Sequence, residues 1–235
     1  MTTQAAIEDQ AVARRWRLRK YTTWVEKLCG EDPGARSALR TGLRRGMDDV
    51  RRMHRFITPW LPENRHVGDD EQRAYYAVAA MIASQPRNSY PQAEAADDKT
   101  EAGTAAQADT GAERKKGPER YGDSLGRAFA TAVGQSPGRD KEMQEATAET
   151  RLNLLTRQSV DGLHRHLPSA VGYLRSLDVP VDWAQLLDDL VAWPTHSGRI
   201  ARRWLQDYYR LRAEAARKQA AQADQHEAEE TGPNQ

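Results

Sequence analysis

The chain of 235 residues is long enough for one large domain or two small ones, each able to bury an apolar core. Its 35 basic and 34 acidic residues nearly cancel, so the net charge of +1 does not by itself identify a nucleic-acid-binding protein. A single cysteine excludes an intrachain disulfide or a thiolate zinc cluster, and the lack of a signal-peptide pattern or long apolar run indicates a cytoplasmic protein without membrane contact.

Helix is the predicted state of almost the whole chain, because Ala, Leu, Arg, Glu and Gln dominate and alternating strand patterns are nearly absent. The sequence therefore indicates an all-α fold with two helical bundles and a long disordered loop between or beside them. Cys29, near the end of the first helix, is expected to be a small buried hydrophobic residue. The N-terminal bundle, residues 1–86, is predicted to contain helices at about 7–28, 33–46, 48–58 and 68–85.

A flexible insertion loop is predicted at residues 87–120. This stretch contains no Leu, Ile, Val, Phe, Met or Trp and cannot bury enough surface to become ordered. Residues 224–235 are polar and are expected to form a disordered tail. The C-terminal bundle, residues 121–223, is predicted to contain helices at about 122–134, 141–158, 160–179, 181–193 and 197–219.

Arginines concentrate in the segment "ARSALRTGLRR", between positions 35 and 45. On the helix predicted over 33–46, Arg36, Arg40 and Arg44 share one side at intervals of one turn, roughly 6 Å, which is close to the spacing of backbone phosphates. A solvated face balanced by acidic residues of another helix explains the same pattern. Local charge adds further candidate phosphate contacts: Arg45, Arg52, Arg55, Arg199, Arg202 and Arg203.

No catalytic motif is found, since the sequence has no phosphate-binding glycine loop, no HExxH and no GxSxG. His164 and His166 lie two residues apart on a predicted helix and do not face the same way, so they make a poor metal pair. Asp188 and Asp189 are interpreted as helix-end charge on a solvated surface. The sequence therefore predicts a protein that is not an enzyme and holds no metal or other cofactor.

Five stretches, in this order, resemble one known family: "EDPGARSALRTGLRRG", "MHRFITPWLP", "GDSLGRAFA", "LPSAVGYLRSLDVPVDWAQLLDDLVAW" and "RRWLQDYY". Together they are similar to the CasB-type small subunit of the type I-E CRISPR Cascade surveillance complex. The resemblance runs from about Trp24 to Tyr209 and is interrupted at 87–120, where the chain looks to carry an insertion.

The resemblance implies a non-catalytic, all-helical subunit that stabilises the R-loop and the displaced DNA strand through basic surface residues. The partners it implies are the backbone and large subunits of Cascade, guide RNA, target DNA and a second copy of the chain. Carried over to this sequence, the implied nucleic-acid contacts are Arg36, Arg40, Arg44, Arg45, Arg55 and Arg127.

Two other functions stay open at this point. A stand-alone helical DNA-binding regulator would need a recognition helix with base-reading polar residues and, usually, a symmetric dimer. A protein-only scaffold would pair its arginines with acidic residues of a partner protein. A sequence-specific duplex footprint favours the first, and partner binding without nucleic-acid dependence favours the second.

Overall fold

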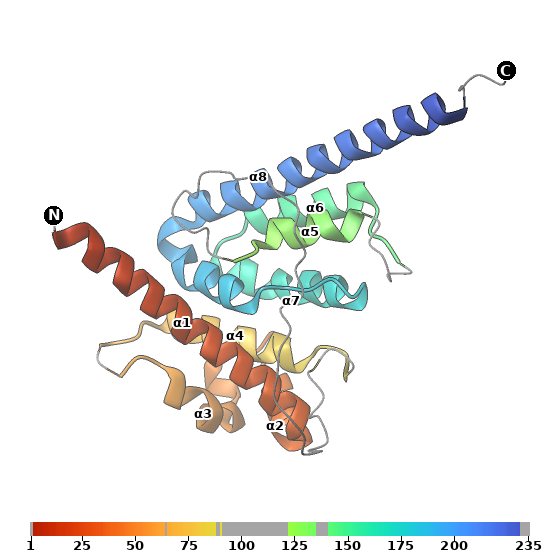
Figure 1. Cartoon of the computed structure of the whole chain (residues 1–235). Coiled ribbons are helices and arrows are strands. Elements are labelled where there is room, and N and C mark those ends of the chain that lie inside the picture. Colours follow the sequence, from red (N-terminus) through yellow and green to blue (C-terminus); the bar gives the residue numbers. More distant parts are fainter. Residues whose placement is uncertain (1, 64, 88–89, 91–121, 135–140, 231–235) are drawn as a thin grey trace, which may run out of the picture.

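The computed structural model describes residues 2–63, 65–87, 90, 122–134 and 141–230. Over these ranges the regular structure is helical and contains no strand, which confirms the all-α prediction. The helices are α1 (Thr2–Glu31), α2 (Pro33–Arg40), α3 (Arg51–Ile57), α4 (Asp69–Ala83), α5 (Leu125–Val133), α6 (Glu145–Thr156), α7 (Val160–Ser176) and α8 (Trp183–Glu230), with short 3-10 turns η1 (Met47–Asp49) and η2 (Thr58–Trp60). Helices α1–α4 form one bundle and α5–α8 the other (Figure 1).

Side-chain caps explain where several helices begin. The Asp32 carboxylate accepts hydrogen bonds from the backbone N–H groups of Gly34 and Ala35, at 2.7 and 3.0 Å. Asp182 accepts from the N–H of Gln185 at 2.9 Å, as the sequence predicted for the residue before α8. Each cap satisfies donors that the first helical turn otherwise leaves without a partner.

Helix α2 is shorter than predicted, since it ends at Arg40 and residues 41–44 form turns. The Thr41 hydroxyl donates to the Ala38 carbonyl at 2.7 Å, and Thr and Gly are weak helix formers. A Cβ on Gly42 would lie 2.8 Å from Met53 Cε, so a side chain there would force Met53 of α3 to shift. Arg44, with φ of 60°, therefore lies beyond the helix and not on the predicted row of arginines.

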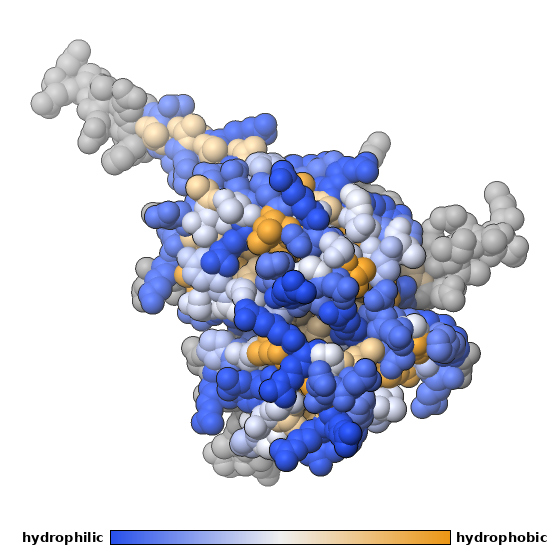
Figure 2. All heavy atoms as spheres, turned by 180° about the vertical axis from the view of Figure 1, so that it is seen from behind, coloured by the Kyte–Doolittle hydropathy of each residue, from blue (hydrophilic) through white to orange (hydrophobic). Residues whose placement is uncertain are grey.

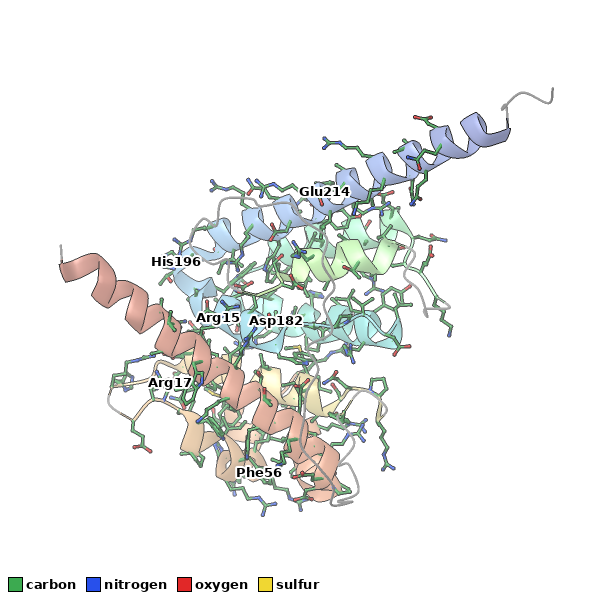
Figure 3. The ribbon with its side chains drawn as sticks, viewed as in Figure 1. Arg15, Arg17, Phe56, Asp182, His196 and Glu214 are labelled. Atoms are coloured by element: carbon green, nitrogen blue, oxygen red, sulfur yellow. The ribbon has the colours of Figure 1, made fainter. Side chains whose placement is uncertain are left out.

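Helix α8 joins the two helices predicted at 181–193 and 197–219 across a kink at His196, which has non-helical φ and ψ of −133° and 23° (Figure 3). Pro194 lies just before this kink and cannot donate a helical hydrogen bond. Trp193 and Trp204, one on each arm, pack with ring centroids 5.2 Å apart.

The predicted disordered tail is wrong up to Glu230, because α8 continues to that residue. Residues 224–230 include three Glu, one Ala and one Gln, and these residue types favour helix without needing burial. The end of α8 projects beyond the other helices (Figure 1). Residues 231–235 lie outside the described ranges.

Both bundles contribute to one continuous apolar core. Tyr21 of α1 and Phe129 of α5 are fully buried, as are Trp204 and Tyr208 of α8. Helix α8 holds the bundles together, because it packs against α1 and α4 as well as against α5 and α6. On the face opposite to that of Figure 1, hydrophilic residues dominate and hydrophobic ones show only as scattered spots (Figure 2).

Polar contacts tie the bundles together around this core. Arg14 of α1 pairs with Asp188 of α8 at 2.9 Å, and Arg175 Nε donates to Gln85 Oε1 at 2.7 Å. Arg15 and Asp182 line one small hollow between α1 and the start of α8 (Figure 3).

The structure describes two residues of the predicted insertion, Arg87 and Tyr90, and Tyr90 belongs to the core. Tyr90 is buried, and its hydroxyl donates to the Ile82 carbonyl at 2.6 Å. A tyrosine can anchor such a segment without aliphatic residues, because its ring buries apolar area while its hydroxyl finds an acceptor. Residues 88–89 and 91–120, the rest of the predicted loop, lie outside the described ranges.

Candidate nucleic-acid interface

Most of the arginines predicted to contact nucleic acid are exposed, and two are partly buried. The partly buried ones are Arg36 and Arg203. The exposed ones are Arg40, Arg44, Arg45, Arg52, Arg55, Arg127, Arg199 and Arg202.

Arg36 supports the fold at the end of α4. Its Nε donates to the Ala83 carbonyl at 3.2 Å and its Nη2 to the Gln85 carbonyl at 2.7 Å. The guanidinium also lies over the Tyr90 ring, 4.9 Å from its centroid. A cation at a helix C-terminus satisfies carbonyls that lack helical donors and complements the helix dipole.

Arg203 pairs with Asp189, which is only 2% exposed. Asp189 also accepts from Gln185 Nε2 at 2.8 Å and from Trp204 Nε1 at 2.6 Å. Burial raises the pKa of Asp189, and the Arg203 guanidinium is the largest influence opposing that rise. The prediction of a solvated surface is therefore wrong for Asp189, because one step of about 100° around α8 turns it inward while Asp188 stays near solvent.

Other predicted arginines make only light contacts within the fold. Arg127 pairs with Asp123 one helical turn away, its Nε 2.7 Å from Oδ1, and Arg55 lies over the Phe56 ring at 4.4 Å. Exposed pairs of this kind contribute less than about 1 kcal/mol, so a phosphate can compete for these guanidinium groups. Arg199 and Arg202 are exposed on the second arm of α8.

A basic groove lies where the turn after α2 meets α4 and α7. We call it the junction groove, and its cavity volume is about 230 Å³. Its lining includes four guanidinium groups, one carboxylate and one imidazole, which belong to Arg44, Arg45, Arg73, Arg165, Asp161 and His164. The groove is therefore positively charged and draws its charge from both bundles.

Two of these arginines are held by contacts between the bundles. Arg44 donates to the Ser169 hydroxyl, and Arg73 forms an ion pair with Asp161. Arg73 also lowers the pKa of Asp161, mainly through this hydrogen bond. Arg45 and Arg165 are exposed at the rim, where a phosphate from outside can reach them.

His164 is the buried imidazole of the junction groove. Burial, helped by the nearby Arg73 guanidinium, lowers its pKa to about 4. The side chain is therefore neutral at pH 7 and adds no charge to the groove.

The low pKa of His164 predicts a loss of stability in acid. Below pH 6.5 the unfolded chain binds a proton at this residue that the folded chain excludes until about pH 4. Stability is therefore expected to fall by about 3 kcal/mol as the pH drops through this window, because the linkage amounts to 1.36 kcal/mol per pKa unit. Urea unfolding at several pH values measures this slope.

His164→Leu should reduce the dependence of the unfolding free energy on pH, whereas His66→Gln, at an exposed position, should leave it unchanged. An equal slope in wild type and His164→Leu would contradict the assignment.

Neither a metal-binding cluster nor a membrane-spanning helix is present in the parts of the chain that the structure describes. These parts hold no group of three or more His, Cys, Asp or Glu side chains arranged to bind a metal ion. None of their helices is long and apolar enough to cross a membrane.

The order of the helices and the positions of the basic residues can be compared with known proteins. The model of the family described as CRISPR-associated protein Cse2 matches residues 35–209, from the first turn of α2 to Tyr209 in the second arm of α8. The chain belongs to the Cse2 family. The junction groove and Arg36, Arg40, Arg199 and Arg202 all fall inside the matched region.

Individual relatives agree with the Cse2 assignment. The CRISPR-associated protein Cse2 of Thermus thermophilus is 24% identical over 195 residues, which cover 81% of this chain and 88% of the relative. A chain of a solved CRISPR RNA-guided surveillance complex is 32% identical, with a TM-score of 0.67, over 87% of this chain and 98% of that one. A crystal structure of a Cse2-family protein from Thermus thermophilus, 23% identical with a TM-score of 0.55, shares the fold over 82% of this chain and 97% of that one.

Sequence reasoning missed two groove residues of this Cse2-family chain, Arg73 and Arg165. Arg73 is the only basic residue of α4 and Arg165 lies ten residues before the next arginine of α7, so no run of arginines marks either position. Their position beside Arg44 and Arg45 depends on how α4 and α7 pack.

Proposed function

We propose that this chain is the non-catalytic small subunit of a type I-E CRISPR RNA-guided surveillance complex. The observation that carries the proposal is the likeness to a chain of such a complex, which extends over nearly the whole of that chain. Its partners are the backbone and large subunits, guide RNA, target DNA and a second copy of itself. Its task is to stabilise the R-loop and the displaced strand.

The distribution of charge supports this role. In RNA-guided recognition, base pairing with the guide supplies sequence specificity, so a supporting subunit needs phosphate contacts and not base readout. Arg45 and Arg165 at the junction groove, with Arg40, Arg52, Arg199 and Arg202 elsewhere, provide guanidinium groups that match phosphate geometry. Arg36 and Arg203 mainly stabilise the fold. Arg36 donates hydrogen bonds to the carbonyls of Ala83 and Gln85, and Arg203 pairs with the Asp189 carboxylate.

Co-purification tests membership of the complex. The tagged full chain, recovered from its native host, is expected to bring down the other subunits and short guide RNAs. Recovery with unrelated proteins and without RNA would contradict the proposal. A symmetric duplex footprint from the chain alone would favour the regulator instead.

Replacing Arg45 and Arg165 with glutamine should weaken R-loop binding by the assembled complex about tenfold at physiological salt. If each arginine neutralises one phosphate, the salt slope of binding also falls by roughly 1.8. Target binding is measured by filter retention at four salt concentrations.

The control variant replaces Arg210 and Arg217, both exposed on the second arm of α8, and removes the same charge far from the groove. If both double variants bind alike, the groove is not the contact.

A further inference from the structure

A second basic hollow, separate from the junction groove, lies at the corner between α1 and α2. Its cavity volume is about 470 Å³, which is in the range of pockets for small ligands. Its lining includes Arg36, Arg40, Arg87, Ser37, Tyr90 and Cys29 and contains no acidic residue. We call it the Tyr90 hollow.

The Tyr90 hollow has a rigid floor. Tyr90 is fixed through its hydroxyl to the Ile82 carbonyl, and the Arg36 guanidinium lies over its ring. Arg36 is itself held by two carbonyls at the end of α4. The Arg36 guanidinium is therefore already in position before a ligand binds, and binding costs little side-chain entropy at this residue.

No lining group offsets this charge. Burial raises the pKa of Cys29 to about 12 and that of Tyr90 to about 12, so both are neutral at pH 7. The Asp32 carboxylate, close by in the chain, is engaged by the N–H groups that begin α2. Arg40 and Arg87, both exposed, add two further guanidinium groups to a lining that also includes Ser37.

We propose that the Tyr90 hollow binds one phosphate group of a nucleic-acid strand between Arg36, Arg40 and Arg87. Guanidinium forks match paired phosphate oxygens, and Ser37 offers a hydroxyl donor of the kind common at phosphate sites. The volume leaves room for the attached sugar. The inference deepens the proposed function and rests on it for the source of the phosphate, since free phosphate has the same chemistry.

Two measurements on the full chain test the hollow with the double variant Arg40→Gln, Arg87→Gln, which leaves Arg36 and the fold contacts intact. The first is thermal unfolding in inorganic phosphate at constant ionic strength. A phosphate concentration ten times the Kd should raise the Tm of the wild type by about 4 °C and leave that of the double variant unchanged.

The second measurement is fluorescence anisotropy of a labelled single-stranded oligonucleotide at several salt concentrations. The double variant should bind roughly five- to tenfold more weakly, and its salt slope should be smaller by about 0.7, as expected for one lost phosphate contact. The control with Arg210 and Arg217 replaced should behave as wild type in both measurements.

The outcomes separate the hollow from the proposed function. Loss of both effects supports a strand phosphate in the hollow. Loss of phosphate stabilisation with unchanged strand binding would overturn the strand as the source and assign free phosphate. If neither effect is lost, the hollow is no anion site, while weaker target binding by the Arg45 and Arg165 variant would still support the proposed function.

Discussion

Replacing Gly126 with alanine is expected to destabilise the protein by about 3 kcal/mol or more, a large fraction of a typical domain's stability. Gly126 lies in α5 where that helix meets the backbone of α8. An added Cβ would come 2.6 Å from the Trp204 carbonyl carbon and 2.9 Å from its Cα, with the carbonyl oxygen closer still. Backbone cannot rotate away as a side chain can, so the two helices must separate. Chemical denaturation followed by circular dichroism measures the loss.

Gly172 provides the matched control for this substitution. It is exposed in α7, and an added Cβ there meets nothing within 4 Å. Gly172→Ala should therefore stabilise the protein by roughly 0.5–1 kcal/mol, because alanine loses less backbone entropy in a helix. Similar effects at the two positions would show that α5 and α8 are not in such close contact.

Asp189→Ala should cost about 3 kcal/mol of folding stability, as breaking a buried ion pair commonly does. The change leaves Trp204 Nε1 and Gln185 Nε2 without their acceptor and Arg203 without its counter-ion. The expected result in thermal or urea unfolding is a lower midpoint with the same helical content at low temperature.

The neighbouring Asp188 provides the control that distinguishes the loss of a buried network from the loss of one negative charge. Asp188→Ala removes an equal charge, but its partner Arg14 is about half exposed, so the cost should stay below about 1 kcal/mol. A loss at Asp188 as large as that at Asp189 would contradict the buried network.

The sequence was sufficient where local chemistry decides the structure. The apolar spacing in α4, the Asp182 cap and the break before His196 all depend on neighbours within a few residues, and the structure agrees with each. The predicted end of α2 and the predicted length of α8 were wrong. Thr41 and Gly42 are weak helix formers that end α2 early, and residues after 223 include helix-favouring types that extend α8.

The site depends on contacts that local patterns do not encode. Arg36 and Arg203 have the same local appearance as Arg40 and Arg202, yet the first two meet carbonyls of α4 and a buried aspartate. Nothing near position 165 in the sequence points to Arg45, although the fold brings the two into one groove. Charge runs along a chain therefore suggest candidates, and packing decides which of them reach solvent.

The continuous core has a consequence for how the subunit responds to strain. Since α8 carries apolar residues into both bundles, neither bundle keeps its buried surface if the other melts. The chain is then a single cooperative unit, and fragments cut near residue 120 would each expose half of a shared interior. Moving one bundle against the other would pull part of this shared core apart, so a force applied to one bundle also acts on the other.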